Sequence, residues 1–324
     1  MKKRRTRVGV ICGGQSTEHE VSLRSAENVI AALDKEKYEI VRILINKKGG
    51  WEWGSEEQIE VAFPVLHGPL GEDGTVQGFL KLMGIPFVGP SVLGSAIGMD
   101  KDVQKRLLRD AGIPVAKFVV VRIQDRDTIS FAEAKKKLGL PMFVKPANAG
   151  SSVGVHKVKN EKDFAGAIED AFKYDRKILI EEGIVGQEIE CAVLGNEDPI
   201  ASVPGEVKPN HEFYSYEAKY IDENGALLEI PAKLSPQLTK EVQETALATF
   251  KVLECEGMSR VDCFVTPDGR VLVNEINTIP GFTKISMYPK LWAASGVSYP
   301  ALLDRLIALA LARAKREKKL KTTY

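Results

Sequence analysis

The chain has 324 residues, of which 44% are hydrophobic and 27% charged, a composition typical of a globular protein with two or three domains. Its formal net charge of +1 gives no overall field that would favour nucleic acid or an anionic membrane as a partner. The four cysteines lack paired spacing, which argues against a disulfide framework or a zinc site. The apolar run after Arg7 is too short for a signal peptide, and no segment has the length of a bilayer span, so we expect a cytoplasmic protein.

The first hundred residues alternate between apolar strands and helices, which predicts an α/β domain built on a parallel sheet. We expect strands at residues 7–12, 40–45, 62–66 and 86–88, and helices that begin near Thr17 and cover 75–83 and 92–111. Thr17 and Glu20 have the spacing of a capping box, which gives Glu20 a structural explanation. Ligands would lie beyond the carboxyl ends of the strands, at the glycine loop 13–16 and the loop 67–74.

The rest of the chain predicts two further units. The first, entered through a connector at 112–114, would be a small α+β domain with an antiparallel sheet. Its strands are expected at 118–122, 142–146, 153–158 and 177–182, with helices after Ser130 and Asn160. The second would contain strands at 188–194 and 200–207, a polar loop at 209–225, a Ser235-capped helix to about Leu253 and a last helix from about Tyr299. We therefore place the domains at 1–100, 101–187 and 188–324.

A β-hairpin within residues 260–281 has the most distinctive pattern in the chain. Two β-branched runs flank Thr266-Pro-Asp-Gly, which has the composition of a tight turn. Strand alternation puts Arg260, Asp262 and Phe264 on one face. If Thr266 pairs with Val271, Asp262 lies opposite Glu275, and Arg260 lies opposite Asn277.

Two carboxylates directly across a strand pair repel each other, so we expect a cation between Asp262 and Glu275. Carboxylate and amide oxygens suit Mg²⁺, which is usually shared with substrate phosphates. A surface hairpin with solvated acids explains the same residues, and for an isolated Asp/Glu pair it is the commoner case. The hairpin alone therefore does not decide between the two interpretations.

A glycine-rich loop follows Lys145, with the sequence Lys-Pro-Ala-Asn-Ala-Gly-Ser-Ser-Val-Gly between two expected strands. Backbone N–H groups and the hydroxyls of Ser151 and Ser152 can cover a triphosphate, and Lys145 can hold its charge. The loop is not a Walker A motif, which needs a lysine after the glycines and a following helix. Taken alone, an ordinary glycine-serine hairpin loop is an equally good interpretation.

The order of these motifs resembles that of the ATP-grasp superfamily, and within it the chain is similar to the D-alanine-D-alanine ligases. The resemblance covers nearly the whole length and rests on the stretches 13–23, 67–74, 99–101, 145–154, 217–220 and 274–281. It implies an N-terminal α/β substrate domain followed by a two-domain ATP-grasp fold that clasps ATP. The implied reaction joins two D-alanines through D-alanyl phosphate, for peptidoglycan precursor synthesis, and the implied assembly is a homodimer.

The resemblance also assigns nucleotide and metal roles to individual residues. Two Mg²⁺ ions, with Mn²⁺ as a substitute, would be held by Asp262, Glu275 and Asn277. The ATP contacts would come from Lys101 and Lys145 at the phosphates, Glu181 at the adenine, Glu188 at the ribose, and Ser152 and Lys219. The run Glu182-Gly-Ile departs from the family, which often has a bulky residue there, so Phe143 and Phe264 would supply the apolar contact instead.

The substrate roles implied by the resemblance involve both ends of the chain. Glu18 would bind the ammonium of the first D-alanine and form a hydrogen-bonded set with Ser151 and Tyr220, while His67 would lie beside the substrate. For Glu18 a helix-terminal acid, and for His67 a structural histidine, are the competing interpretations. The oxyanion would be stabilised by Arg260 and the backbone of Gly281, and the second carboxylate would be held by Ser286 and Met287.

Two other functions compete with this interpretation. Ligases that join D-alanine to D-lactate resemble the chain but commonly have Phe or His in place of Tyr220, so this tyrosine favours an amine acceptor. A regulator that binds nucleotide without turnover would have lost metal or oxyanion residues, and none is missing from this sequence. A NAD-binding protein is set aside because Gly13-Gly-Gln-Ser lacks the Gly-x-Gly-x-x-Gly spacing.

Overall fold

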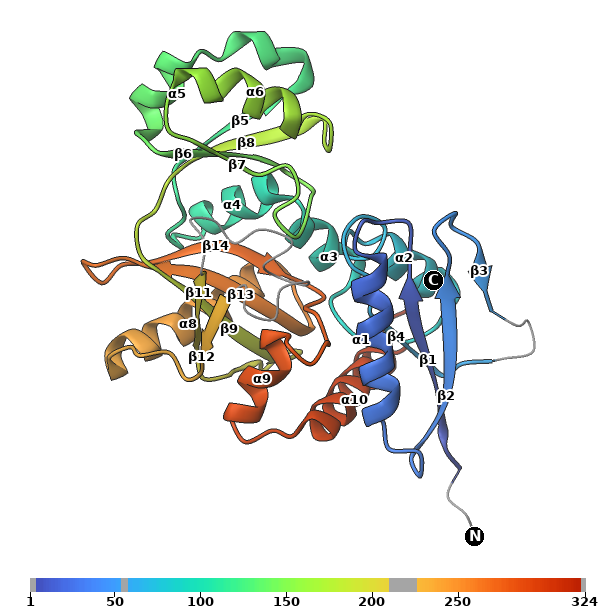
Figure 1. Ribbon diagram of the computed structural model, residues 1–324. Coiled ribbons are helices and arrows are strands. Elements are labelled where there is room, and N and C mark those ends of the chain that lie inside the picture. The colour runs from blue at the N-terminus through green and yellow to red at the C-terminus, as the bar shows by residue number, and fades with distance from the viewer. Residues whose placement is uncertain (1–3, 54–57, 210–225, 322–324) are drawn as a thin grey trace.

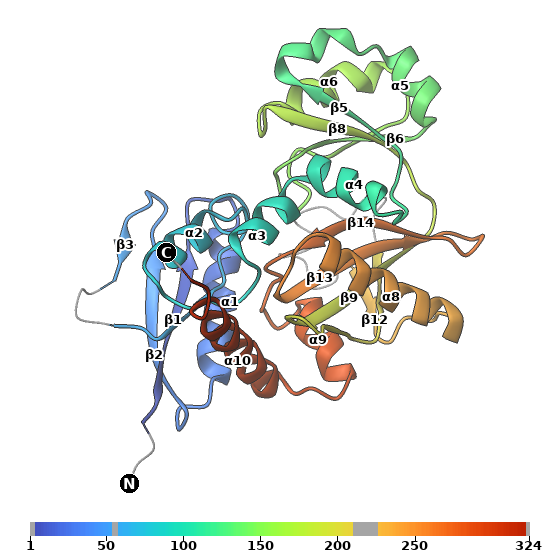
Figure 2. The same ribbon diagram turned by 180° about the vertical axis from the view of Figure 1, so that it is seen from behind.

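The computed structural model describes residues 4–53, 58–209 and 226–321. Within these ranges the chain forms three sheets, which appear as three lobes around a common centre (Figures 1 and 2). The mixed α/β and α+β class expected from the sequence is confirmed. Among the described helices none alone is long and apolar enough to cross a membrane, and only α9 with α10, bent by 105°, passes that test as a pair.

The N-terminal sheet has the strand order β3-β2-β1-β4. Its strands are β1 (Thr6–Gly13), β2 (Tyr38–Ile45), β3 (Trp51–Glu52) and β4 (Val61–Pro64), and its helices are α1 (His19–Ala32), α2 (Thr75–Leu82) and α3 (Val92–Met99). Strands β2, β1 and β4 are parallel, as predicted, because crossover connections return each strand in the same direction. Residues 86–88 form a single bridge from Phe87 to Ala62 rather than the expected strand, and β3 was not predicted.

The capping box predicted for Thr17 and Glu20 is wrong. Helix α1 begins at His19, with Glu18 in the N-cap position and no side-chain cap. Ser16 fixes this entry instead, since its hydroxyl donates to the His67 carbonyl (2.7 Å) and accepts from the Glu18 N–H (3.2 Å). Glu20 lies on the outer side and forms an ion pair with Lys47 (2.9 Å).

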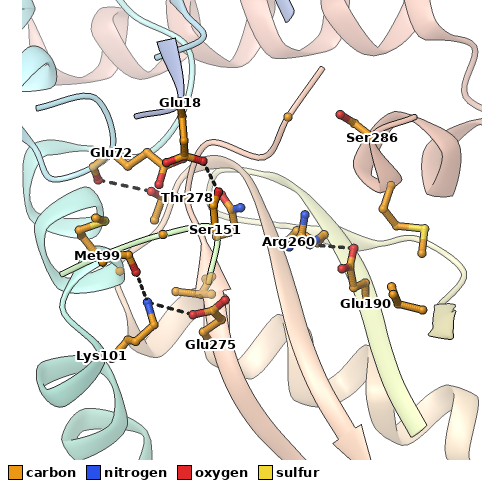
Figure 3. Close-up of a pocket in the computed structure, with 18 of the residues that line it drawn as sticks. Glu18, Glu72, Met99, Lys101, Ser151, Glu190, Arg260, Glu275, Thr278 and Ser286 are labelled. Carbon is orange, nitrogen blue, oxygen red and sulfur yellow. Dashed lines mark hydrogen bonds and ion pairs between the residues drawn. The ribbon is translucent and has the colours of Figure 1, made fainter. Parts of the chain in front are cut away.

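The single helix expected at 92–111 is two helices, α3 and α4 (Lys101–Asp110), which break at Asp100. The Asp100 carboxylate caps α4 by accepting from the N–H groups of residues 102 and 103 (3.1 Å each). The same carboxylate forms an ion pair with Lys177 (2.6 Å), a residue distant in the sequence. The break therefore places Lys101 at the first position of a new helix, from which its side chain is directed at Glu275 (Figure 3).

The central sheet is antiparallel with the order β5-β8-β6-β7, as the sequence predicted. Its elements are β5 (Phe118–Arg122), a 3-10 helix (Ile123–Thr128), α5 (Phe131–Leu138), β6 (Met142–Pro146), β7 (His156–Val158), α6 (Glu161–Ala171) and β8 (Lys177–Glu182). Strand β7 begins at His156, three residues later than expected, so the glycine-rich loop extends to residue 155.

The C-terminal sheet has the order β12-β11-β9-β13-β14, with β10 paired to β9. Its strands are β9 (Gln187–Gly195), β10 (Ile200–Ala201), β11 (Gly205–Pro209), β12 (Ala226–Glu229), β13 (Gly257–Val265) and β14 (Val271–Asn277), and its helices are α8 (Pro236–Val252), α9 (Met287–Ala294) and α10 (Tyr299–Glu317). The strand expected at 200–207 is interrupted at 202–204, and β12 and α9 were not predicted. The domain boundaries near 100 and 187 stay a prediction.

Helix α10 returns to the N-terminal sheet and lies between the first and third lobes (Figure 2). Leu302, Leu303 and Leu306 of this helix share one hydrophobic core with Val8 and Phe63. At its far end the buried Arg313 guanidinium donates to the carbonyls of Gly89 (2.6 Å) and Phe87 (2.7 Å) and lies 4.4 Å from the Phe87 ring centroid. This arginine therefore fastens the C-terminal helix to the first sheet.

Arg313→Met should lower the free energy of unfolding by about 3 kcal/mol, because two charge-assisted hydrogen bonds are lost and two buried carbonyls lose their donor. The methionine keeps most of the apolar stem. Urea unfolding at constant pH measures the change. Arg305→Met, on the exposed side of the same helix, is the matched control and should stay within about 0.5 kcal/mol of the parent. Equal effects of the two substitutions would contradict the fastening role.

Candidate active site

Two pockets meet at the centre of the molecule. The first pocket draws its walls from all three lobes and includes Glu18, Glu72, Arg260 and Ser286 (Figure 3). The second pocket lies between the central and C-terminal sheets and is lined by residues such as Phe143, Lys145, Glu188 and Phe264. The two pockets share one stretch of wall, formed by Lys101, residues 149–151 and Glu275.

The hairpin β13–β14 places its acids as the sequence predicted. Asp262 pairs with Glu275, and Arg260 pairs with Asn277. The assumed pairing of Thr266 with Val271 is wrong, since Val265 is the partner of Val271.

A β-bulge in β14 explains why the pairing at the turn differs from the prediction while the pairing of Asp262 with Glu275 agrees with it. The register shifts between Asp262 and Cys263, so that Asn274 is an extra residue on β14. Asn274 and Glu275 consequently both line the second pocket, although strict alternation would separate them. Asn274 accepts a hydrogen bond from Lys145 Nζ (3.4 Å), and sequence reasoning assigned it no role.

The cation expected between the two carboxylates is supplied, in this structure, by side chains of the chain itself. Arg260 makes two hydrogen bonds to Asp262 (Nε–Oδ1 and Nη2–Oδ2, both 2.7 Å), and its Nε also lies 2.9 Å from Glu190 Oε2. Lys101 Nζ lies 3.0 Å from Glu275 Oε2. The acids are therefore neutralised within a cleft, and they are not the solvated acids of a surface hairpin.

A buried chain of charges supports the second pocket. Glu181 forms ion pairs with Lys145 (2.8 Å) and with Lys105 (3.3 Å), whose side chain is fully buried. Burial raises the pKa of the Glu181 carboxyl, but the two lysines outweigh it and the pKa is lowered. Burial lowers the pKa of Lys105 to about 8. Lys105 was not foreseen, although its spacing of four from Lys101 places both lysines on one face of α4.

The glycine-rich loop touches the N-terminal lobe. The Ser151 hydroxyl donates to the Glu18 carboxylate, and Lys101 Nζ donates to the Ala149 carbonyl (2.8 Å), as Figure 3 shows in part. The backbone φ angles of Ser151 and Ser152 are 52° and 60°, a left-handed conformation that residues other than glycine rarely adopt. The structure therefore brings the predicted Glu18 and Ser151 together and holds the loop over the cleft.

His67 is buried beside this contact and pairs with a residue that the sequence did not single out. Its Nδ1 lies 3.3 Å from Glu72 Oε1. Burial lowers the pKa of the imidazole, but the hydrogen bond and charge of Glu72 outweigh it, so the His67 pKa is raised. Burial also raises the pKa of Glu72. Glu72 itself lines the first pocket, so the loop 67–74 supplies an acid as well as a histidine.

The opposite end of the first pocket is formed by Gly281, Ser286 and Met287. A Cβ atom at Gly281 would lie 2.7 Å from Ser286 Oγ, so this position has room for glycine only unless the serine moves. Ser286 precedes α9, and its Oγ accepts from the Thr283 N–H (3.0 Å). The predicted site residues Lys219 and Tyr220 lie outside the described residues.

Asp262, Glu275 and Asn277 offer oxygen atoms that suit a hard divalent cation; Glu275 belongs to the shared wall, Asn277 lines the first pocket and Asp262 lines a small cavity beside them. Asn277 Oδ1 is buried and has no hydrogen-bond partner in the described structure, and Asp262 and Glu275 add carboxylates on the same face. No cluster of three or more His, Cys, Asp or Glu side chains in the described ranges forms a complete metal site. A cation held here would therefore share its coordination with oxygens of a bound phosphate, as is usual for Mg²⁺.

Comparisons with known proteins cover the whole length of the chain. The family model for the D-ala D-ala ligase C-terminus matches residues 107–308, and that for the N-terminus matches residues 7–61 and 52–90. A D-alanine-D-alanine ligase of Oceanobacillus iheyensis is 52% identical, with 100% of this chain and 99% of the relative aligned.

Two solved structures share the fold. The D-alanine-D-alanine ligase from Coxiella burnetii has a TM-score of 0.89 at 39% identity and covers 98% of this chain and 97% of its own. The ligase from Bacillus anthracis complexed with ATP has a TM-score of 0.81 at 35% identity, with 96% and 99% covered. The similarity therefore extends over all three sheets.

Proposed function

Because this chain belongs to the D-alanine-D-alanine ligase family, we propose that its second pocket binds ATP and its first pocket binds two D-alanine molecules. The chain is an ATP-dependent enzyme that joins two D-alanines. The observation that carries the assignment of the pockets is their shared wall, where Lys101 and Glu275 face both. The phosphate to be transferred would lie at this wall, within reach of a carboxylate in the first pocket.

In the first step the carboxylate oxygen of one D-alanine attacks the γ-phosphorus of ATP, the bond to the β-phosphate oxygen breaks, and ADP leaves. Lys101, which is part of the shared wall, and Lys145, which lines the second pocket, would neutralise the charge that develops on the phosphate oxygens. Glu18 would hold the ammonium group of this D-alanine. The contact of Ser151 with Glu18 closes the glycine-rich loop against the N-terminal lobe, which would shield the acyl phosphate from water.

Mg²⁺ would be held by Asp262, Glu275 and Asn277, with two ions expected and Mn²⁺ as a substitute. When bound, it would supply positive charge to the phosphate oxygens and orient them for in-line transfer. The support for this is the set of hard oxygen donors, among them the buried, unpaired Asn277 Oδ1.

In the second step the amine of another D-alanine attacks the acyl carbon, and the carbon–oxygen bond to phosphate breaks. The attacking amine is in its neutral form, and its proton passes to the departing phosphate, which leaves as hydrogen phosphate. Arg260 and the Gly281 N–H would stabilise the oxyanion of the tetrahedral intermediate. Ser286 and the backbone at Met287 would hold the carboxylate of the second D-alanine, since they line the same end of the first pocket.

The adenine end of the second pocket would use apolar contact and backbone. Phe143 and Phe264 line it from the two sheets, and Glu188 would hold the ribose, with Ser152 near the phosphates. Both carboxylate oxygens of Glu181 are paired with lysines, so we assign this residue chiefly to positioning Lys145.

We also propose that the enzyme is a cytoplasmic homodimer that serves peptidoglycan precursor synthesis. The support for a dimer is the set of large apolar side chains exposed on α2 and α3, namely Phe79, Leu82 and Leu93, with Met83 just after α2. Their burial against a second copy would remove apolar surface from water.

ADP release tests the function directly. We expect release with D-alanine, none above background with L-alanine alone, and an amide product by mass spectrometry. If D-lactate with D-alanine gives an alkali-labile ester as the main product, the depsipeptide ligase is the correct assignment. ATP binding without ADP release under every substrate combination would instead favour the non-catalytic regulator.

A further inference from the structure

Arg260 is held by carboxylates on two sides. Asp262 lies two residues along β13, and Glu190 lies on the neighbouring strand β9, directly across from Asp262 in the register. The side chains of all three are largely buried, with exposed fractions of 16%, 16% and 12% for Arg260, Asp262 and Glu190. Figure 3 shows the guanidinium directed at Glu190 within the first pocket.

Glu190 lies in an electrostatically unfavourable position. Two carboxylates at directly opposed positions repel each other, and burial strengthens the repulsion. Arg260 relieves it because the guanidinium contacts both acids. An uncharged residue on β9 would avoid the repulsion altogether, so the acid at 190 is costly unless it does something that Asp262 does not.

Asp262 and Glu190 have different roles. In the proposed function Asp262 is a metal ligand, whereas in this structure both of its oxygens accept hydrogen bonds from Arg260. A divalent cation at Asp262 would repel the guanidinium and compete for those oxygens. Arg260 would then lose its hydrogen bonds to Asp262 during the reaction, when the guanidinium is required near the oxyanion.

We propose that Glu190 is a positioning residue that keeps Arg260 at the acceptor end of the first pocket while Asp262 turns to the metal. The proposal rests on the proposed function, since it uses the oxyanion role of Arg260. Glu190 lines both the first pocket and a small cavity that it shares with Asp262 and Glu275, so it can follow the arginine without leaving its strand. When metal binds, Arg260 gives up its contact with Asp262 and keeps its contact with Glu190. Metal binding thereby leaves Arg260 in place for the second step.

Loss of the charge at 190 would have two linked effects. Arg260 would bind Asp262 more strongly and compete better against the metal, so metal affinity would fall. When metal does bind, the arginine would no longer be fixed near the oxyanion, so attack by the second amine would slow more than formation of the acyl phosphate.

The test uses Glu190→Gln, which keeps the shape and removes the charge. Mn²⁺ binding is measured by the electron paramagnetic resonance of free Mn²⁺ in the presence of a non-hydrolysable ATP analogue, and the Kd should rise about tenfold. Hydroxylamine traps the acyl phosphate as D-alanine hydroxamate, which measures the first step without the second. The ratio of hydroxamate to dipeptide should increase about tenfold, with the urea midpoint little changed.

Two further variants complete the design. Glu190→Asp keeps the charge at a shorter reach and should recover part of both effects, and it replaces the glutamine variant if that one fails to fold. Glu241→Gln, an exposed acid on α8, is the matched control and should change neither quantity. An unchanged Mn²⁺ affinity, or an equal loss of hydroxamate and dipeptide, would overturn the proposal. Absence of both products in the parent enzyme would instead refute the proposed function.

Discussion

Glu275→Gln should lower kcat at least about a hundredfold and leave the fold intact. Glu275 lies on the wall shared by the two pockets, opposite Asp262 and 3.0 Å from Lys101. Glutamine keeps the shape but removes a negative charge from the proposed metal site and from Lys101. Loss of about 3 kcal/mol of transition-state stabilisation corresponds to this factor.

Steady-state ADP release and thermal unfolding, measured on the same preparations, check this expectation. Asp268→Asn is the matched control, since Asp268 is an acid at the exposed turn of the same hairpin and pairs with Arg270 (2.8 Å). It should retain parental activity. A large fall in the unfolding temperature of Glu275→Gln, in step with the lost activity, would mean that the carboxylate serves the fold rather than the reaction.

Glu181→Gln should lower the free energy of unfolding by about 3 to 5 kcal/mol and weaken ATP binding. The substitution leaves Lys105, which is fully buried, without its carboxylate partner, and an uncompensated buried charge is strongly destabilising. Lys145 also loses the group that holds it at the second pocket. Urea unfolding and calorimetric titration with ATP measure the two effects separately.

The double variant Lys105→Met with Glu181→Gln is the control for this explanation. It removes both charges and should recover most of the stability, because a buried ion pair can be replaced by neutral side chains at little cost. ATP affinity should stay low, since Lys145 is still without its carboxylate. If the double variant is no more stable than Glu181→Gln alone, the lost stability does not come from Lys105.

The ion pair of Lys105 with Glu181 should make the free energy of unfolding depend on pH. The folded protein releases the Lys105 proton near pH 8, whereas the unfolded chain keeps it to about 10.5. Between these values the unfolded state binds more protons, so Lys105 makes the free energy of unfolding rise with pH in this window. Glu181 has a lowered pKa, so its contribution is present above the ordinary value of 4.5 and is lost as the pH falls through the folded value. Lys105→Met should remove the alkaline rise.

The sequence predicted those parts of the site that depend on strand periodicity. Alternation with a period of two places Arg260 and Asp262 on one face. The predicted pairing of Asp262 with Glu275 is confirmed, but only because the bulge at Asn274 offsets the wrong pairing assumed at the turn. The three sheets followed from the order of strands and helices. These features depend on residues that are close in the sequence.

Features that depend on distant contacts were not predicted. Helix α4 begins at Lys101, after its N-cap Asp100, whose carboxylate forms an ion pair with Lys177. The entry to α1 is set by Ser16, which bonds to the His67 carbonyl, and this contact replaces the predicted capping box. The contact of Glu18 with Ser151 was expected only from the family resemblance. The roles of Lys105 and Glu72 depend on burial beside a partner from another segment, which a pattern of residue types along the chain does not specify.

The bulge in β14 shows how the cleft tolerates changes in chain length. Removing Asn274 would join Val273 directly to Glu275, and the ladder would continue in regular pairing with Cys263 and Asp262 as the partners. The acids would keep their places, and what would disappear is the amide that accepts from Lys145. An extra residue in this strand thus adds a polar group to the cleft without disturbing the groups already there.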